Sequence, residues 1–158
     1  MIRAMIGTVA VLAGFAVVER SVDASTGQAG SCTPTDAYAL LPQGEIAPVA
    51  AEPKLDAAVV GALRGRVVVT MSGSHGGWAR ISLPESPQFH GWVPADLLRV
   101  EARANGPLSL YDRPGPLGHK LATLDGEAGS FRVLGCRGSW LHVINARTGA
   151  VWIDKTRY

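Results

Sequence analysis

The stretch GGWARISL, residues 76–83, alternates apolar and polar side chains in the way that is typical of a β-strand with one buried face. Because successive side chains of a strand point to opposite faces, Ala79, Ile81 and Leu83 are expected to point inward. Trp78 and Arg80 are then expected on the outer face. The two glycines before the tryptophan indicate a hairpin turn, where positive φ angles are frequent. We therefore predict a strand that begins at this turn and carries a tryptophan on its surface.

The same pattern returns in the stretch GSWLHVIN, residues 138–145. Here Leu141 and Val143 are the expected inward residues, and Trp140 and His142 are the expected outward ones. Two similar stretches in the two halves of a chain indicate an internal duplication. Each half is therefore expected to present a tryptophan at the same place.

Further matches in the same order support this duplication. The run GWV at residues 91–93 corresponds to VWI at residues 151–153. Each half then consists of five short strand-like runs separated by Gly, Pro, Ser or Asp, which is the pattern of a small barrel or sandwich. The upstream matches are Arg66–Met71 with Ser130–Leu134, Ala58–Leu63 with Lys120–Leu124, and Ile46–Ala50 with Leu108–Tyr111.

At these residues the sequence resembles the bacterial SH3 (SH3b) family, in which a Gly-Trp pair, an alternating strand and a closing Gly-Trp-Val follow in order. The resemblance covers residues 45–100 and again residues 107–158. It implies an all-β fold class with two consecutive SH3-like small β-barrels. It also implies a non-catalytic module of the kind that attaches exported proteins to peptidoglycan or to peptides.

The stretch GWVPADLL, residues 91–98, also looks like the closing strand and helical turn of eukaryotic SH3 domains, which bind polyproline in an aromatic groove. Leu97 stands where that family has a groove tyrosine. The matching residues 154–157 have neither the proline nor the tyrosine. The resemblance to a polyproline groove is therefore incomplete in the first half and absent in the second.

The amino terminus has the pattern of a signal peptide, because Arg3 precedes an apolar stretch over residues 4–18. This stretch is shorter than the roughly twenty residues that cross a bilayer, so no stable membrane span is expected after cleavage. Small residues at Val22 and Ala24 place the expected cleavage after Ala24, which makes residues 1–24 the signal peptide. The protein is therefore expected to be periplasmic or secreted.

Residues 25–44 are rich in Ser, Thr, Gly, Ala and Pro and show no sustained periodicity, so we expect a linker or a docked arm. Cys32 in this segment and Cys136 in the second half could form one disulfide in an oxidising compartment. The alternative is two unrelated thiols. The formal net charge of +2 is too small to steer the protein to nucleic acid by its overall field, so no nucleic-acid partner is expected.

Trp78 and Trp140 are the strongest candidates for ligand contact, because an outward indole offers a large rigid apolar surface with one hydrogen-bond donor. Arg80, His142 and Tyr111 could line the same surface. The alternative is structural, with the tryptophans buried against the neighbouring barrel or a partner subunit.

Catalysis and cofactors are not expected. Cys136 and His142 are close in sequence, but the cysteine is expected in a glycine-rich hairpin rather than at a helix amino terminus that would favour a thiolate. The four histidines have none of the short spacings of a zinc site, and no phosphate-binding loop is present, so we expect no metal and no cofactor. A cysteine hydrolase is the least favoured alternative.

The sequence therefore predicts an exported binding module for cell-wall glycan or peptide, or for an envelope protein. The rival prediction is a structural subunit whose tryptophans form interface core.

Overall fold

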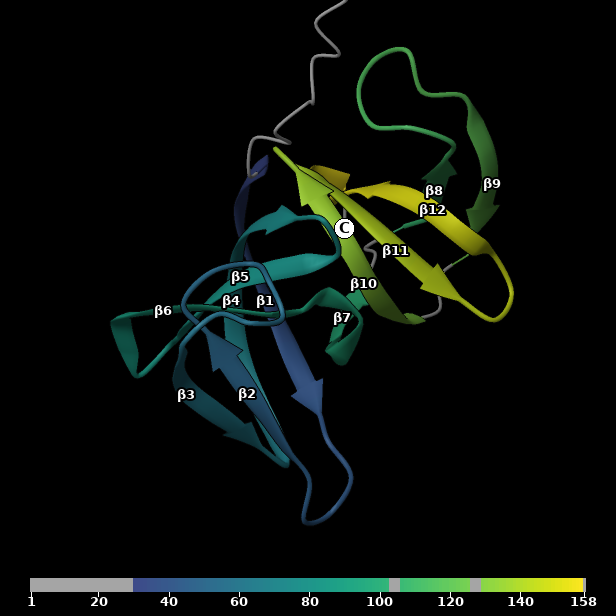
Figure 1. Cartoon of the computed structure of the whole chain (residues 1–158). Coiled ribbons are helices and arrows are strands. Elements are labelled where there is room, and N and C mark those ends of the chain that lie inside the picture. Colours follow the sequence, from purple (N-terminus) through teal and green to yellow (C-terminus); the bar gives the residue numbers. More distant parts are fainter. Residues whose placement is uncertain (1–29, 103–105, 126–128, 158) are drawn as a thin grey trace, which may run out of the picture.

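The computed structural model of the chain describes residues 30–102, 106–125 and 129–157 (Figure 1). The described residues are all-β, as predicted, and their only helices are two short 3-10 turns, η1 (Ala95–Leu97) and η2 (Lys155–Arg157). None of these helices could cross a membrane. The predicted signal peptide, residues 1–24, lies outside the described residues.

The strands are β1 (Gly30–Leu40), β2 (Ile46–Ala50), β3 (Val59–Arg64), β4 (Arg66–His75), β5 (Trp78–Leu83), β6 (Ser86–Pro94), β7 (Leu98–Ala102), β8 (Leu108–Tyr111), β9 (Lys120–Leu124), β10 (Gly129–Arg137), β11 (Trp140–Asn145) and β12 (Gly149–Asp154).

All twelve strands form one antiparallel sheet in the order β3-β2-β6-β5-β4-β1-β7-β10-β11-β12-β8-β9. β3 and β9 stand at the two ends of this order. The centre is occupied by β1 and β7, which pair with each other. Figure 1 shows the first half of the chain on one side of these central strands and the second half on the other.

The strand registers repeat between the halves, as the duplicated sequence pattern predicts. The β4–β5 hairpin has an irregularity between Met71 and Gly73, and the β10–β11 hairpin has one between Val133 and Gly135. Such bulges bend a strand and set its twist, so their shared position gives both hairpins the same local shape. A second shared irregularity lies between Val49 and Ala50 in β2 and between Leu110 and Tyr111 in β8.

The short helices repeat as well. The backbone N–H of Ala95, at the start of η1, donates to the carbonyl of Gly77 at 2.8 Å. The N–H of Lys155, at the start of η2, donates to the carbonyl of Ser139 at 2.9 Å. In both halves the chain that leaves the sheet is therefore fastened to the turn before the tryptophan strand.

The segment expected to be a linker or docked arm contains β1, the longest strand among the described residues. Thr35, Ala37 and Ala39 alternate into the interior, while Asp36 and Leu40 face outward. The alternation is difficult to see in the sequence because the buried positions hold small residues of low hydropathy. The structure therefore has a paired strand over Gly30–Leu40, in place of the expected linker or docked arm.

β1 and β7 hold corresponding places in the two halves, because β1 pairs with β4 and β7 pairs with β10. Each copy then consists of six strands and one 3-10 helix, over residues 30–97 and 98–157. These ranges differ from the expected 45–100 and 107–158, because each copy gains the strand that precedes its first hairpin. Tyr38 of β1 lies opposite Arg99 of β7, so two equivalent antiparallel strands join the copies.

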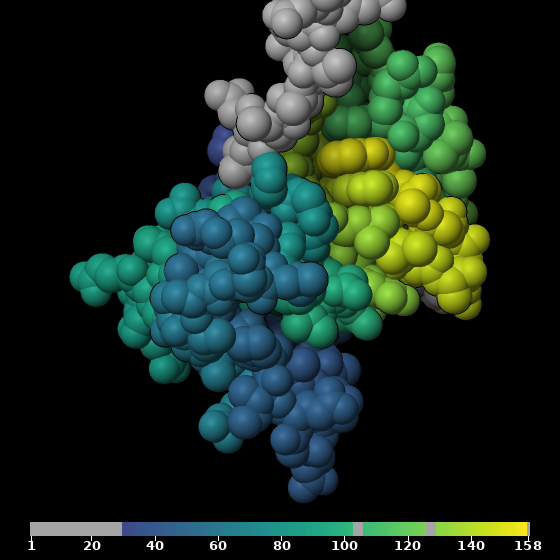
Figure 2. Space-filling model, in the orientation of Figure 1, coloured from purple at the N-terminus to yellow at the C-terminus, as the bar shows by residue number. Residues whose placement is uncertain are grey.

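The buried apolar side chains form one continuous cluster that includes residues of both copies. The predicted inward residues Ala79, Ile81, Leu141 and Val143 belong to it and are fully buried, whereas the predicted inward Leu83 is only partly buried and packs against it. The sequence predicts two separate interiors, whereas the adjacent central strands join them into one. In Figure 2 the first copy, blue to teal, lies directly against the second copy, green to yellow. The largest fully buried side chains are Phe131, Met71, Ile81, Leu98, Leu110, Leu141 and Ile153.

Polar and covalent contacts also tie the copies together near the start of β1. Cys32 and Cys136 form a disulfide, with Cα atoms 5.8 Å apart. The hydroxyl of Ser74 in β4 accepts a hydrogen bond from the N–H of Cys136 at 2.9 Å and donates to its carbonyl at 3.1 Å. Lys155 Nζ donates to the carbonyls of Thr33 at 2.9 Å and Pro34 at 2.6 Å. The second copy therefore holds β1 through both backbone and side-chain groups.

Candidate binding site

A hollow of about 300 Å³ opens beside Trp78 in the first copy. Trp78 begins β5 and lies opposite Pro94, the last residue of β6. The charged residues that line the hollow are Glu45 and Lys54, and the salt bridge of Lys54 to Glu52 raises the pKa of this lysine. The apolar lining includes Leu41, Ile46, Pro48, Leu55, Val59 and Leu97. We call this space the Trp78 hollow.

The Trp78 hollow leaves apolar side chains open to solvent. Leu55 is 95% exposed, Val59 is 66% exposed and Ile46 is 48% exposed. A group of large apolar side chains at the mouth of a hollow is typical of a surface that contacts a ligand or a partner. The chemistry of this hollow is therefore suited to an aliphatic or ring-shaped apolar group.

A second hollow, of about 290 Å³, opens beside Trp140 in the second copy. Tyr111 meets the Trp140 ring edge-on, with centroids 5.1 Å apart and an angle of 85° between the ring planes. Asp154 and Arg157 add charge to the lining, and Arg157 Nε lies 3.6 Å from a carboxylate oxygen of Asp154. Pro116 is a further lining residue. We call this space the Trp140 hollow.

The two hollows lie at corresponding places in the two copies. Trp78 pairs with Pro94 across β5 and β6, and Trp140 pairs with Asp154 across β11 and β12. Both tryptophans are the first residues of their strands and are half-buried. The duplication thus places a tryptophan in a hollow twice, once with an apolar lining and once with a polar, charged one.

Aromatic side chains continue along the sheet from the Trp140 hollow. Tyr111 lies opposite Trp152 in the β8–β12 pairing. His142 stacks on Trp152, with centroids 4.6 Å apart and ring planes at 9°. Burial lowers the pKa of His142. We call Trp140, Tyr111, Trp152 and His142 the aromatic row.

The structure separates the predicted contact residues into distinct groups. Trp140 and Tyr111 lie together in one hollow, and His142 follows them in the aromatic row. Trp78 lies in the other copy. Arg80 is exposed on β5, where it pairs with Trp92 of β6 in the position that His142 and Trp152 occupy in the second copy.

Several lining residues were not predicted. The sequence does not identify Leu55 and Val59 of the Trp78 hollow, or Asp154 and Arg157 of the Trp140 hollow, as contact residues. The cross-strand partner of each tryptophan could have been found by continuing the repeat alignment through GWV and VWI. Leu55 lies in a loop without a matching motif, so the sequence has no comparable signal for it.

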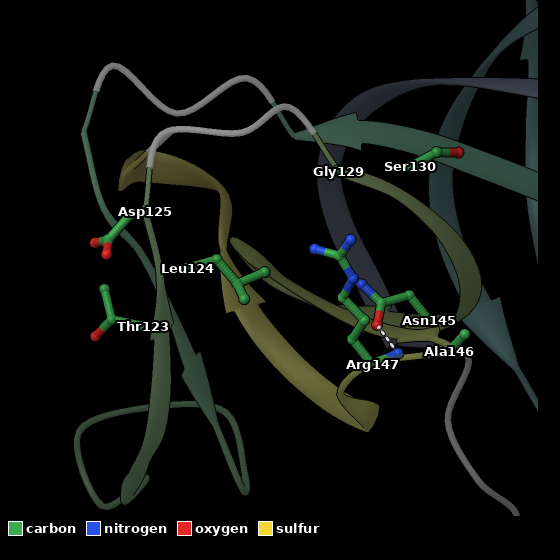
Figure 3. Close-up of a pocket in the computed structure, with 8 residues that line it drawn as sticks. All are labelled: Thr123, Leu124, Asp125, Gly129, Ser130, Asn145, Ala146 and Arg147. Carbon is green, nitrogen blue, oxygen red and sulfur yellow. Dashed lines mark hydrogen bonds between the residues drawn. The ribbon is translucent and has the colours of Figure 1, made fainter.

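A further hollow lies beside the end of β9, the start of β10 and the turn after β11. Its lining includes Thr123, Leu124 and Ser130, none of which is a predicted contact residue (Figure 3). Asn145 Oδ1 accepts a hydrogen bond from the N–H of Arg147 at 2.9 Å and fixes the turn at one wall. We assign no site to this hollow.

The described residues contain neither a cluster of metal-binding side chains nor a free thiol. They contain no group of three or more His, Cys, Asp or Glu side chains that could hold a metal ion. Cys136 is bound to Cys32 and does not present a thiolate beside His142.

No protein-family model matches the chain, and no curated protein matches it. Two solved structures from Trichomonas vaginalis show a distant likeness. NlpC2 is 14% identical with a TM-score of 0.35, over 79% of this chain and 47% of that one. NlpC1 is 14% identical with a TM-score of 0.37, over 82% of this chain and 48% of that one. The chain spans about half the length of these two proteins, and the likeness is too low to assign a fold family or a function.

Proposed function

We propose that this protein is an exported, non-catalytic binding module with two SH3-like units of the bacterial SH3 type. In this proposal the units bind peptidoglycan, through its glycan or its peptide, at the Trp78 and Trp140 hollows. The observation that carries the proposal is the recurrence of a half-buried tryptophan in a hollow at the same place in both copies. The Gly-Trp and Gly-Trp-Val motifs support the assignment to SH3-like units.

The chemistry of the hollows suits such a ligand. The face of an indole offers a flat apolar surface to the C–H groups of a sugar ring or to an aliphatic side chain, and its N–H can donate a hydrogen bond. Two similar sites on one chain also suit a repeating polymer, because the second contact forms at a high effective concentration once the first has formed. Export is supported by the predicted signal peptide and by the cysteine pair, since disulfides persist in oxidising compartments.

Retention of the protein on purified peptidoglycan tests this function. Trp78→Ala and Trp140→Ala are each expected to weaken retention by about tenfold or more, because each removes one of two cooperating contacts. The double variant is expected to show no retention above a control protein. Retention of the double variant at the wild-type level would contradict the proposal.

A gentler variant separates loss of binding from loss of folding. Leu55 is 95% exposed, so Leu55→Asp is expected to leave the melting temperature unchanged while weakening retention through the charge it adds to the Trp78 hollow. Leu121 of β9 is 58% exposed and lines neither hollow, so Leu121→Asp is the matched control. Equal retention of the two variants would remove the Trp78 hollow from the proposal.

A structural role is the second candidate, and the exposed Leu55 and Val59 favour it because such side chains are also typical of protein interfaces. In that case the same surface would bind an envelope protein. Leu55→Asp would then leave peptidoglycan retention unchanged and disrupt a complex with the partner.

A further inference from the structure

A separate hollow of about 550 Å³ lies between the turn of the β4–β5 hairpin and the carboxyl-terminal end of β10. His75, Gly76 and Gly77 of the first copy line one side, and Gly135 and Arg137 of the second copy line another. We call it the interhairpin hollow. It lies apart from the Trp78 and Trp140 hollows and shares no lining residue with either.

The titratable lining of the interhairpin hollow is basic. Arg137, His75 and His142 line it, and no Asp or Glu is among its lining residues. The neighbouring carboxylate on β12 is Asp154, which lines the Trp140 hollow and pairs with Arg157 at 3.6 Å. An anion in the interhairpin hollow would therefore meet a permanent cation, Arg137, without a competing carboxylate in the lining.

One side of this hollow is flat and aromatic. His142 and Trp152 both line it and stack on each other with ring planes at 9°. The lining residues Gly76 and Gly77 have φ angles of 52° and 83°, and a Cβ at either would meet nothing within 4 Å. These two turn residues therefore place no side chain in the hollow.

The walls are held in place before any ligand arrives. Both hydrogen bonds of the Ser74 hydroxyl join β4 to Cys136, and the disulfide joins Cys136 to Cys32. Since Ser74 and Cys136 themselves line the hollow, its two sides are fixed relative to each other. A preformed site loses little free energy to ordering when it binds.

We propose that the interhairpin hollow binds a sugar ring that carries a carboxylate. Arg137 receives the carboxylate through charge-assisted hydrogen bonds, which are the stronger kind in proteins. His75 can donate a further hydrogen bond, and the ring packs beside His142 and Trp152. A carboxylate could also come from a peptide terminus, but the flat aromatic side favours a ring. The proposal is independent of peptidoglycan binding at the two tryptophan hollows.

The test titrates the full chain with two pairs of small probes. Binding is monitored by NMR through the indole N–H signal of Trp152, and this signal is assigned with the variant Trp152→Phe. D-glucuronate is expected to shift this signal with saturation, and D-glucose to bind roughly tenfold more weakly or not at all. N-acetylalanine and its amide form the second pair and report on a chain-terminal carboxylate. Binding of N-acetylalanine without binding of glucuronate would overturn the proposal.

Charge-matched variants locate the site. Arg137→Gln is expected to weaken glucuronate binding about tenfold and to leave glucose unaffected. Arg64→Gln is the control, because this substitution removes the same charge at an exposed position. Arg64 belongs to β3, which lies at one end of the sheet. Equal binding by the two variants, or equal binding of glucose and glucuronate, would overturn the proposal. Peptidoglycan retention of Arg137→Gln is measured in parallel, so that a failure at this hollow is distinguished from a failure at Trp78 and Trp140.

Discussion

At the scale of single residues, the protonation of His142 is affected by its packing against Trp152. His142 is half-buried, and the resulting loss of solvation lowers its pKa below that of an exposed histidine. The folded protein therefore favours the neutral form of the His142 imidazole. Trp152 on β12 and Gly135 on β10 lie beside the ring and do not titrate, while His75 of β4 and Arg137 of β10 line the same hollow as His142.

This pKa shift predicts a pH dependence of stability. The unfolded chain has a histidine pKa of about 6.5, so below that value the unfolded state binds a proton that the folded state resists. The contribution of His142 is present above about pH 6.5 and is lost as the pH falls toward the lowered folded pKa. The melting temperature of the wild type is expected to drop more between about pH 7.5 and about pH 5 than that of His142→Phe, which keeps an aromatic ring on Trp152. Equal drops would show that this histidine is not responsible.

Part of the candidate site is predictable from sequence at this scale. The alternation in residues 76–83 and 138–145 identifies Trp78 and Trp140 as candidates beside the fully buried Ile81 and Val143. The contact of Trp140 with Tyr111 depends on pairing between strands far apart in sequence. No local pattern carries that information.

At the scale of elements, β1 differs most from its sequence-based description. Its composition of Ser, Thr, Ala and Pro predicts a linker or a docked arm, yet the segment pairs with β4 along its length and with β7 at its end. Small side chains suit this position because strands on both sides and the shared core crowd it. The hairpins, whose inward positions hold Ile, Val and Leu, follow from the sequence because their alternation is strong.

Neighbouring substitutions test whether β1 is an integral strand. Ala39 is fully buried and Leu40 is 60% exposed. Ala39→Asp is expected to lower the free energy of unfolding by about 3 kcal/mol or more, because it buries a charge without a partner. Leu40→Asp is expected to change it by no more than about 0.5 kcal/mol. Urea denaturation of both variants provides the measurement, and a docked arm that contributes little stability would make them equal.

At the scale of the whole molecule, the two copies share one core and are joined by equivalent strands. The duplication itself is predictable from the paired motifs, and the repeated bulges agree with it. The union of the two interiors is not predictable, because it depends on β1 and β7 lying next to each other. Two covalently linked copies with a common core are expected to unfold as one unit rather than one after the other.

The disulfide is expected to contribute strongly to this common stability. Cys32 and Cys136 are 104 residues apart in sequence, so their bond closes a long loop and removes much entropy from the unfolded chain. The double variant Cys32→Ala, Cys136→Ala is expected to lose about 4 kcal/mol of unfolding free energy. Dithiothreitol should lower the melting temperature of the wild type and leave that of the double variant unchanged. A wild type insensitive to complete reduction would contradict this account.

The bond between Cys32 and Cys136 also determines how the protein responds to mechanical load. When the chain is pulled from its two ends, tension passes from Cys32 directly to Cys136, and residues 33–135 are bypassed. Most of β1, the strands from β2 to β9 and the turn before Trp78 then carry no direct load, whereas the turn before Trp140, β11 and β12 lie on the loaded path. While the bond is intact, the chain between the two cysteines adds nothing to the length of the protein under load, and reduction of the bond releases that segment to extend.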